Sequence, residues 1–170
     1  MEELIEKAKK KDEEAFTELI LKIQKDLYSI ARIRLNNQDD ICDVVQETMI
    51  IAYKDLSKLK EDKYFKTWII RILINKCNQT YRNKHKWMIS FEDNEMEKYL
   101  IKKDKTDKLD FDILIRHLNK QEKTIMKLYY YLEYTTKEIS GILKIREGTI
   151  RSKISRAKSK IKNEYKGEFE

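Results

Sequence analysis

Apolar residues recur at three- and four-residue intervals through most of the chain, which predicts amphipathic helices separated by short polar breaks. The first long helix begins after Asp12, and a polar break follows it, where Asp39 or Asp40 can cap the second helix. Segment 56–63 has a loop-like composition, and a third helix runs from about Tyr64 to Lys86. The apolar positions that define these three helices are Phe16, Leu19, Ile20, Ile23, Leu27 and Ile30; Ile41, Val44, Val45, Thr48, Ile51 and Ala52; and Trp68, Ile69, Ile72 and Leu73.

The helical pattern breaks down in the middle of the chain and then returns. Residues 88–107 carry mixed charge with few apolar side chains, which favours a flexible linker. Beyond it, Asn119 with Glu122 and Thr135 with Glu138 both have the spacing of a capping box. The chain has no proline and only three glycines, so the usual signals of strands and hairpins are missing. We therefore expect an all-α fold, with two small helical domains (1–87 and 108–170) joined by a charged linker.

The last helical segment has two faces of opposite chemistry. From Thr135 to Lys162 the pattern predicts two helices joined by a short turn, and the second helix has a narrow apolar stripe. A helix with an apolar back and a front of arginines and small hydroxyl residues fits the DNA major groove while resting on a protein core. This segment is therefore predicted to be a DNA-reading helix-turn-helix. The apolar stripe is Ile150, Ile154, Ala157 and Ile161, and the opposite face is Arg151, Ser152, Ser155, Arg156 and Ser159.

Charge is abundant and unevenly distributed. Charged residues make up 39% of the 170 residues, and the net charge of +7 favours a polyanionic partner, which can be nucleic acid or an anionic membrane. Acidic residues gather between Asp39 and Asp62, whereas the stretch from Lys63 to Phe91 contains no Asp or Glu. An acidic helix followed by a basic one indicates two different partners.

Other classes of function find little support in the sequence. The chain has no apolar run long enough to span a bilayer and no signal-peptide pattern, so we expect a cytoplasmic protein. Cys42 and Cys77 form no CxxC pair and are expected to be reduced thiols near helix cores. We find no Gly-rich phosphate loop, no metal-ligand cluster and no nucleophile–base pair. We therefore expect no cofactor, no metal and no catalytic residue.

Three segments taken in order carry a resemblance to a known family. They are DVVQETMIIAYKDL (43–56), YFKTWIIRILINKCNQTYRNKHK (64–86) and GTIRSKISRAKSKIK (148–162). Together they resemble a bacterial RNA polymerase sigma factor of the extracytoplasmic-function branch. A lone helix-turn-helix also occurs in many repressors, but both halves in this order are highly specific.

The resemblance implies that domain 1–87 binds polymerase and opens the −10 promoter element. On the second helix the exposed polar face would dock on the clamp helices of the large polymerase subunit, although an ordinary solvated acidic face is the alternative. The third helix and the loop before it would hold the displaced single strand, because a basic groove with stacking surfaces suits single-stranded DNA. Loop 58–63 occupies the place where the family captures a flipped-out base. Trp68 is expected in the core, and Phe65 is open to either role. The implied polymerase contacts are Asp43, Gln46, Glu47 and Ile50, and the implied −10 contacts are Lys63, Tyr64, Phe65, Lys66, Asn75, Lys76, Asn78 and Arg82.

The resemblance also implies that domain 108–170 reads the −35 element through its helix-turn-helix. Many family members have serine or proline where the recognition helix begins, whereas here Arg146 and Glu147 occupy the turn before Gly148. Helix entry is therefore expected to differ slightly, with Arg146 adding a phosphate contact. The implied −35 contacts are Arg146, Thr149, Arg151, Ser152, Lys153, Ser155, Arg156 and Lys158.

The implied function is that of a sigma factor: a monomer that binds core RNA polymerase, recognises and melts promoter DNA, and is held inactive by an anti-sigma protein. It would not insert into the membrane and would catalyse no reaction. The main alternative is a stand-alone helix-turn-helix repressor or activator, usually a symmetric dimer. That alternative leaves the acidic and basic helices of the first half unexplained. A nucleic-acid enzyme is a weaker third possibility.

Overall fold

Helices build every regular element in the part of the chain that the structure describes. The structure is a computed structural model, and it describes residues 1–88 and 108–165. The predicted all-α fold is confirmed for these residues. The chain divides into two compact units, which contain these two ranges respectively. Apart from Met88, the predicted linker 88–107 lies outside the described residues.

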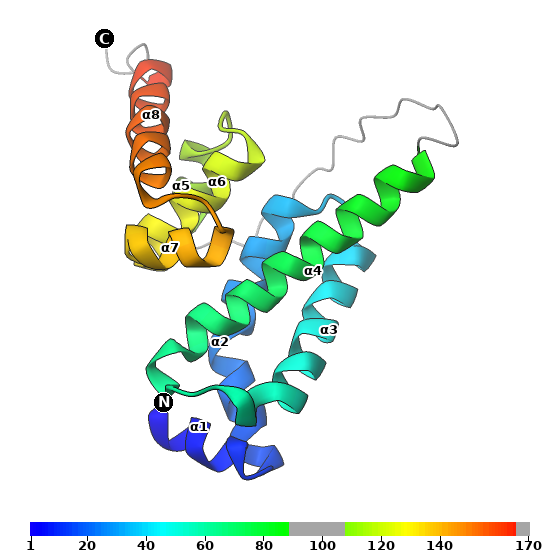
Figure 1. Cartoon of the computed structure of the whole chain (residues 1–170). Helices are drawn as coiled ribbons and strands as arrows, with labels where there is room; N and C mark the ends of the chain where they lie inside the picture. The colour runs from blue at the N-terminus through cyan, green and yellow to red at the C-terminus, as the bar shows by residue number, and fades with distance from the viewer. Residues whose placement is uncertain (89–107, 166–170) are drawn as a thin grey trace. The chain divides into compact units, whose positions relative to one another are not determined.

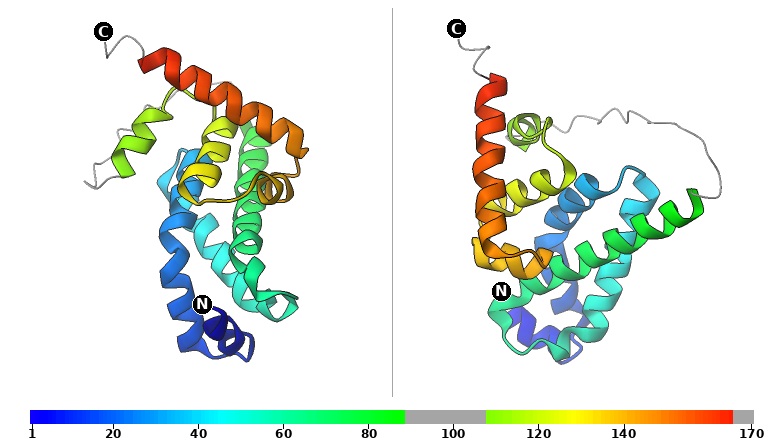
Figure 2. Two further views of the ribbon diagram at one scale, coloured as in Figure 1. Left: turned by 90° about the vertical axis from the view of Figure 1, so that its left-hand side faces the viewer. Right: turned by 45° about the horizontal axis from the view of Figure 1, so that its top comes forward.

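The first unit is a bundle in which three long helices pack against one another (Figures 1 and 2). A short N-terminal helix, which the sequence analysis did not predict, packs against the first long helix, and two 3₁₀ turns lead from the second long helix to the third. The elements are α1 (Glu2–Lys9), α2 (Glu13–Arg34), α3 (Gln38–Asp55), the turns Leu56–Lys58 and Asp62–Tyr64, and α4 (Phe65–Met88).

Side-chain caps fix where the long helices of this unit begin. Asp12 accepts a hydrogen bond from the amide of Ala15 at the start of α2, as the sequence predicts. At the start of α3 the cap is Asn37, whose amide oxygen accepts from the amides of Asp39 and Asp40. The prediction that Asp39 or Asp40 caps α3 is therefore wrong. Both aspartates lie in the first turn, where their charges favour the positive end of the helix dipole.

The core of the first unit lies between α2, α3 and α4. Ile69 and Leu73 of α4 are buried as predicted, whereas Trp68 and Ile72 are only half-buried. Because α4 packs against both α2 and α3, its buried arc is wider than a single stripe and is shifted away from Trp68. The buried side chains of α4 are Phe65, Ile69, Ile70, Leu73, Ile74 and Cys77.

The second unit contains the helix-turn-helix. Both predicted capping boxes are present, with Asn119 and Glu122 opening α6 and Thr135 and Glu138 opening α7. Helix α7 ends at Leu143 and is followed by its C-cap Lys144, which adopts a left-handed conformation with φ of 55°; α8 begins three residues after this cap. The elements are α5 (Lys108–Leu114), α6 (Lys120–Met126), a π-helical turn (Lys127–Tyr131), α7 (Thr136–Leu143) and α8 (Glu147–Tyr165).

Helix α8 lies against α6 and α7 through the apolar stripe that the sequence predicts. Ile150, Ile154 and Ala157 are buried, and Ile161 at the far end is half-buried. In the described part of the chain, no helix is both long and apolar enough to cross a membrane.

Candidate nucleic-acid interface

The outward face of α8 carries the side chains predicted to read duplex DNA. Arg151, Ser152, Ser155 and Arg156 are all exposed, on the side opposite the buried stripe. The guanidinium Nε of Arg156 donates to the backbone oxygen of Ser152 at 3.3 Å, which lays the arginine along the helix surface. The structure thus brings two arginines and two serines together on one solvent-facing surface.

The start of α8 is anchored to α7 by a residue to which the sequence analysis gave no DNA-binding role. Glu147, the first residue of α8, accepts hydrogen bonds from Thr136 Oγ1 and from Arg151 Nη2, both at 2.7 Å. These two bonds hold the pKa of the Glu147 carboxyl below its ordinary value. Glu147 therefore lies inside the helix, where it fixes α8 to α7 and holds Arg151. Arg146 lies just before α8 and is exposed.

The remaining predicted −35 residues differ in their burial and in their contacts with the rest of the unit. Lys158 lies with its ammonium 5.2 Å from the centre of the Tyr130 ring, and its hydrogen bond to Tyr130 raises the pKa of Lys158. Lys153 and Thr149 are half-buried. Lys160, further along α8, forms a 2.7 Å ion pair with the nearly buried carboxylate of Glu122.

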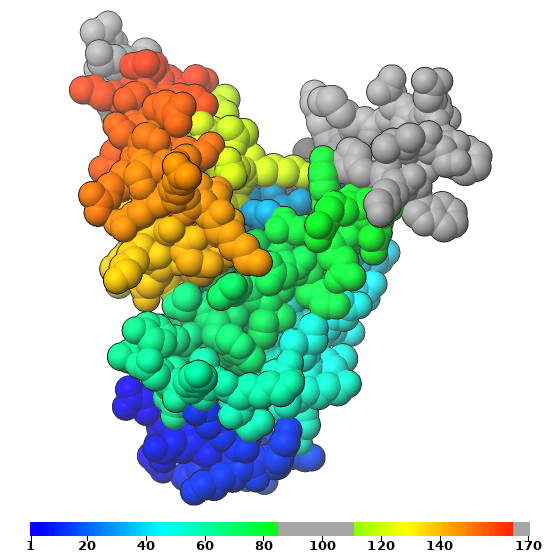
Figure 3. All heavy atoms as spheres, in the orientation of Figure 1, coloured from blue at the N-terminus to red at the C-terminus, as the bar shows by residue number. Residues whose placement is uncertain are grey.

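Helix α4 presents the basic surface of the first unit, and its side chains cover much of the face of that unit seen in Figure 3. Lys66, Asn75 and Arg82 are exposed. Lys76 is half-buried and forms a 2.9 Å ion pair with Glu47 of α3. The amide oxygen of Asn78 accepts a 2.5 Å hydrogen bond from Arg34 of α2.

A second ion pair joins α3 to α4. Lys84 of α4 lies 2.6 Å from a carboxylate oxygen of Asp40, whose side chain is 18% exposed. Together with the Glu47–Lys76 pair, it shows that the acidic and basic helices partly neutralise each other. Neither periodicity nor spacing predicted this pairing.

Two aromatic residues at the junction of the loop and α4, Tyr64 and Phe65, differ in their exposure to solvent. Tyr64 is 45% exposed, and the ammonium of Lys63 lies 4.9 Å from the centre of its ring and 2.7 Å from Glu61. Phe65 is only 1% exposed, because its ring lies in the core. A buried ring cannot stack on a base while the unit stays folded, so Phe65 is removed from the set of DNA contacts.

The predicted polymerase-binding residues form one exposed stripe on α3. Asp43, Gln46, Glu47 and Ile50 all face solvent, at the spacing that places them along one side of a helix. Ile50 is 53% exposed, although it is a large apolar side chain surrounded by polar ones. The cysteines do not form a disulfide: Cys42 is half-buried and Cys77 is buried. The described residues contain no cluster of side chains that could hold a metal ion.

The described residues thus combine a basic helix in one unit, preceded by a loop with an exposed tyrosine, and an exposed arginine–serine helix in the other, an arrangement typical of a DNA-binding protein. Comparison with known families makes the class specific. The family model described as Sigma-70 region 2 matches residues 19–87, and the model described as Sigma-70, region 4 matches residues 109–161. The chain belongs to the sigma-70 family, in its extracytoplasmic-function branch, and is a sigma factor for transcription initiation. The stand-alone repressor is not favoured, because it does not account for region 2.

Individual relatives agree with this assignment. The extracytoplasmic-function sigma-E factor of Haemophilus influenzae is 26% identical over 94% of this chain and 92% of its own length. The sigma-E factor of Escherichia coli K12 is 38% identical, over 42% of this chain and 37% of its own length.

Two solved structures share the fold. The sigma factor RpoE of Bartonella quintana, solved with the anti-sigma factor NepR, matches with a TM-score of 0.71 and 19% identity, covering 87% of this chain and 94% of that chain. CnrH, solved with the cytosolic domain of CnrY, matches with a TM-score of 0.67 and 20% identity, covering 95% of this chain and 94% of that chain.

Proposed function

We propose that the chain divides the work of promoter recognition between its two units. Residues 1–87 bind core RNA polymerase and open the −10 element, residues 108–170 read the −35 element, and residues 88–107 connect them. The observation that carries this proposal is the exposed stripe on α3, where half-exposed Ile50 lies among Asp43, Gln46 and Glu47. An apolar side chain within a polar stripe gives a partner helix a small dry contact surrounded by polar ones.

Strand opening is assigned to α4 and the loop before it. Lys63, Lys66 and Arg82 contact phosphates, and Tyr64 offers a half-exposed ring on which a base can stack. Asn75 is exposed and can hydrogen-bond to a base edge. Two further predicted residues, Lys76 and Asn78, already have protein partners in Glu47 and Arg34, so they would contact DNA through their remaining N–H donors or by exchanging those partners.

Reading of the −35 element is assigned to the outward face of α8. Arg156 and Arg151 reach base edges, because arginine can bind guanine with two hydrogen bonds. The serines allow close approach of the helix, and the basic side chains around them bind phosphates. The full set of proposed −35 contacts is Arg146, Thr149, Arg151, Ser152, Lys153, Ser155, Arg156 and Lys158.

The proposed protein is a cytoplasmic monomer that catalyses no reaction. Opening is driven by binding energy, since captured bases offset the few kcal/mol of lost pairing and stacking. Because many contacts are with phosphates, DNA binding by the holoenzyme weakens steeply as salt concentration rises. An anti-sigma protein is the proposed inhibitor, by analogy with the similar structure of RpoE, which was solved with the anti-sigma factor NepR.

The test is reconstitution with purified core RNA polymerase. Co-elution and fluorescence anisotropy measure binding, and run-off transcription on genomic fragments from the source organism finds start sites. One-to-one binding with new start sites supports the proposal. A chain that fails to bind cognate core, forms a dimer and protects a palindromic duplex would instead be a stand-alone regulator.

A further inference from the structure

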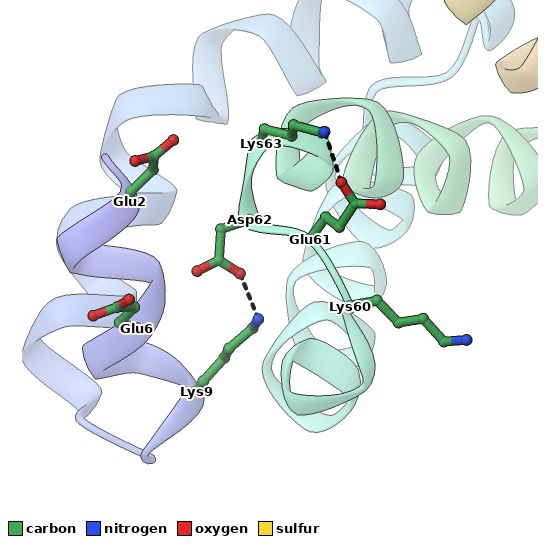
Figure 4. A pocket seen from close by; sticks show the side chains of 7 residues that line it. All are labelled: Glu2, Glu6, Lys9, Lys60, Glu61, Asp62 and Lys63. Atoms are coloured by element: carbon green, nitrogen blue, oxygen red, sulfur yellow. Dashed lines mark hydrogen bonds and ion pairs between the residues drawn. The ribbon is translucent and has the colours of Figure 1, made fainter.

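The N-terminal helix lies beside the loop that leads into α4. Helix α1 precedes residues 19–87, the part matched as region 2. Its buried side chains Ile5 and Ala8 hold it in place, and it contacts both 3₁₀ turns of the loop. Figure 4 shows α1 and the loop forming the two walls of an open pocket.

An ion pair joins these two walls. The ammonium of Lys9 on α1 both donates a hydrogen bond to the carboxylate of Asp62 and pairs with its charge, across 53 positions of sequence. The two side chains are only 22% and 20% exposed, whereas those of the Lys7–Glu3 pair on the same helix are 55% and 79% exposed. Exposed pairs contribute little because water and salt screen them, and a shielded pair is screened less. Asp62 begins the 3₁₀ turn that ends at Tyr64, so Lys9 fixes the backbone at the point where the proposed DNA contacts begin.

A second contact holds the other side of the loop. Just after α1, Lys11 Nζ donates to the backbone oxygen of Tyr53 at 3.1 Å, and its ammonium lies 4.7 Å from the centre of the Tyr53 ring. The Phe16 ring packs edge-on against the same tyrosine at 5.0 Å. Tyr53 belongs to the last turn of α3. The segment from Lys9 to Lys11 therefore bridges the end of α3 and the 3₁₀ turn that precedes α4.

Helix α1 is badly suited to bind DNA itself. Its contributions to the pocket are Glu2, Glu6 and Lys9, so two of its three side chains there would repel phosphates. Its chemistry instead suits a brace that holds the loop.

We propose that α1 positions the loop from Leu59 to Tyr64 for capture of the opened strand, with Lys9 and Asp62 as the positioning residues. This inference rests on the proposed function of the loop. A loop that is already held in one conformation loses little further conformational entropy when it binds DNA. The brace therefore favours opening without itself contacting a base.

The test uses the full chain assembled with core RNA polymerase on a promoter that carries 2-aminopurine in the −10 element. The fluorescence of 2-aminopurine rises when the base unstacks, so it reports opening. Lys9→Met, Asp62→Asn and the double variant remove the ion pair, Lys9→Arg retains it, and Lys7→Met is the matched control on the same helix. We expect Lys9→Met and Asp62→Asn each to reduce the opening equilibrium about three- to tenfold, with the double variant no worse than either. Core affinity should be unchanged, and Lys9→Arg and Lys7→Met should behave like the wild type.

Other outcomes would overturn the inference. If Lys9→Met opens the promoter as well as the wild type does, the proposed function stands and the brace is refuted. If opening, core affinity and thermal stability all fall in parallel, the ion pair only stabilises the fold, and the inference is also wrong. If the wild-type chain binds core but opens no promoter, the proposed function of the loop fails, and the inference fails with it.

Discussion

Replacing Ile50 with alanine tests the proposed polymerase interface most directly. The side chain is 53% exposed in the free chain, so docking can remove about half of its surface from water. Burying a whole isoleucine side chain contributes about 1.5–3 kcal/mol. Half of that range, less the part that the alanine methyl still supplies, is about 1 kcal/mol, which corresponds to about a fivefold increase in Kd.

The assay is fluorescence anisotropy of the labelled chain titrated with core RNA polymerase. Leu21→Ala is the matched control, since Leu21 is 57% exposed and lies on α2, away from the stripe. Neither change empties the core, and alanine favours helix formation, so both variants should unfold at or slightly above the wild-type temperature. Ile50→Ala should then weaken binding about fivefold while Leu21→Ala has no effect.

Two results would refute this reasoning. Equal affinities of Ile50→Ala and Leu21→Ala for core polymerase would mean that Ile50 stays in water in the holoenzyme and that the interface lies elsewhere. A loss of affinity accompanied by a lower unfolding temperature would mean that Ile50 supports the fold rather than the interface.

Three further predictions concern the other regions. Arg156→Ala should weaken binding to the cognate −35 duplex about 1–3 kcal/mol more than binding to an unrelated duplex, both measured by anisotropy; equal losses would make Arg156 a phosphate contact. Burial is the largest single influence on the pKa of Glu122 and acts to raise it, but the hydrogen bonds from Lys160 and from the Asn119 amide, together with the charges of Lys160 and Lys153, outweigh burial and lower the net pKa. The contribution of Glu122 to stability is therefore complete above the unfolded pKa of about 4.3 and is lost as the pH falls through the lower folded value. The free energy of unfolding, measured with urea, should therefore decline less steeply with falling pH for Glu122→Gln than for the wild type, and parallel declines would contradict this. Burial raises the pKa of Cys77 to about 11, so Ellman's reagent should modify half-buried Cys42 first and reach Cys77 only on unfolding, whereas two rapid phases in the native chain would refute the assignment.

Features that depend on neighbouring residues were predictable from the sequence. The capping boxes at Asn119 and Thr135 each join residues three positions apart, so spacing alone identifies them. The apolar stripe of α8 is equally local, because one helix determines it. Even a local feature can be mispredicted where several capping residues lie close together. At α3 the sequence offered Asp39 and Asp40 as caps, but Asn37 caps the helix.

Features that depend on distant segments were not predictable. Helix α1 has eight residues and only two buried side chains, so its apolar pattern is too short to stand out, and it is held by contacts with α2 and the loop. Phe65 and Trp68 lie one helical turn apart, and only the packing of α4 against two helices buries the first and half-exposes the second. The Glu47–Lys76 ion pair likewise joins two helices whose periodicity predicts only that both residues face outward.

The ion pairs between α3 and α4 limit how this protein can be re-engineered. A chimaera that exchanged α4 alone, in order to alter its proposed contacts with the −10 element, would leave Glu47 and Asp40 facing side chains selected for another neighbour. The exchange would also replace Asn78, whose amide oxygen accepts a 2.5 Å hydrogen bond from Arg34 of α2. Helices α2 to α4 should therefore be exchanged as one piece, so that the helix proposed to bind polymerase moves together with the helix proposed to bind the −10 element.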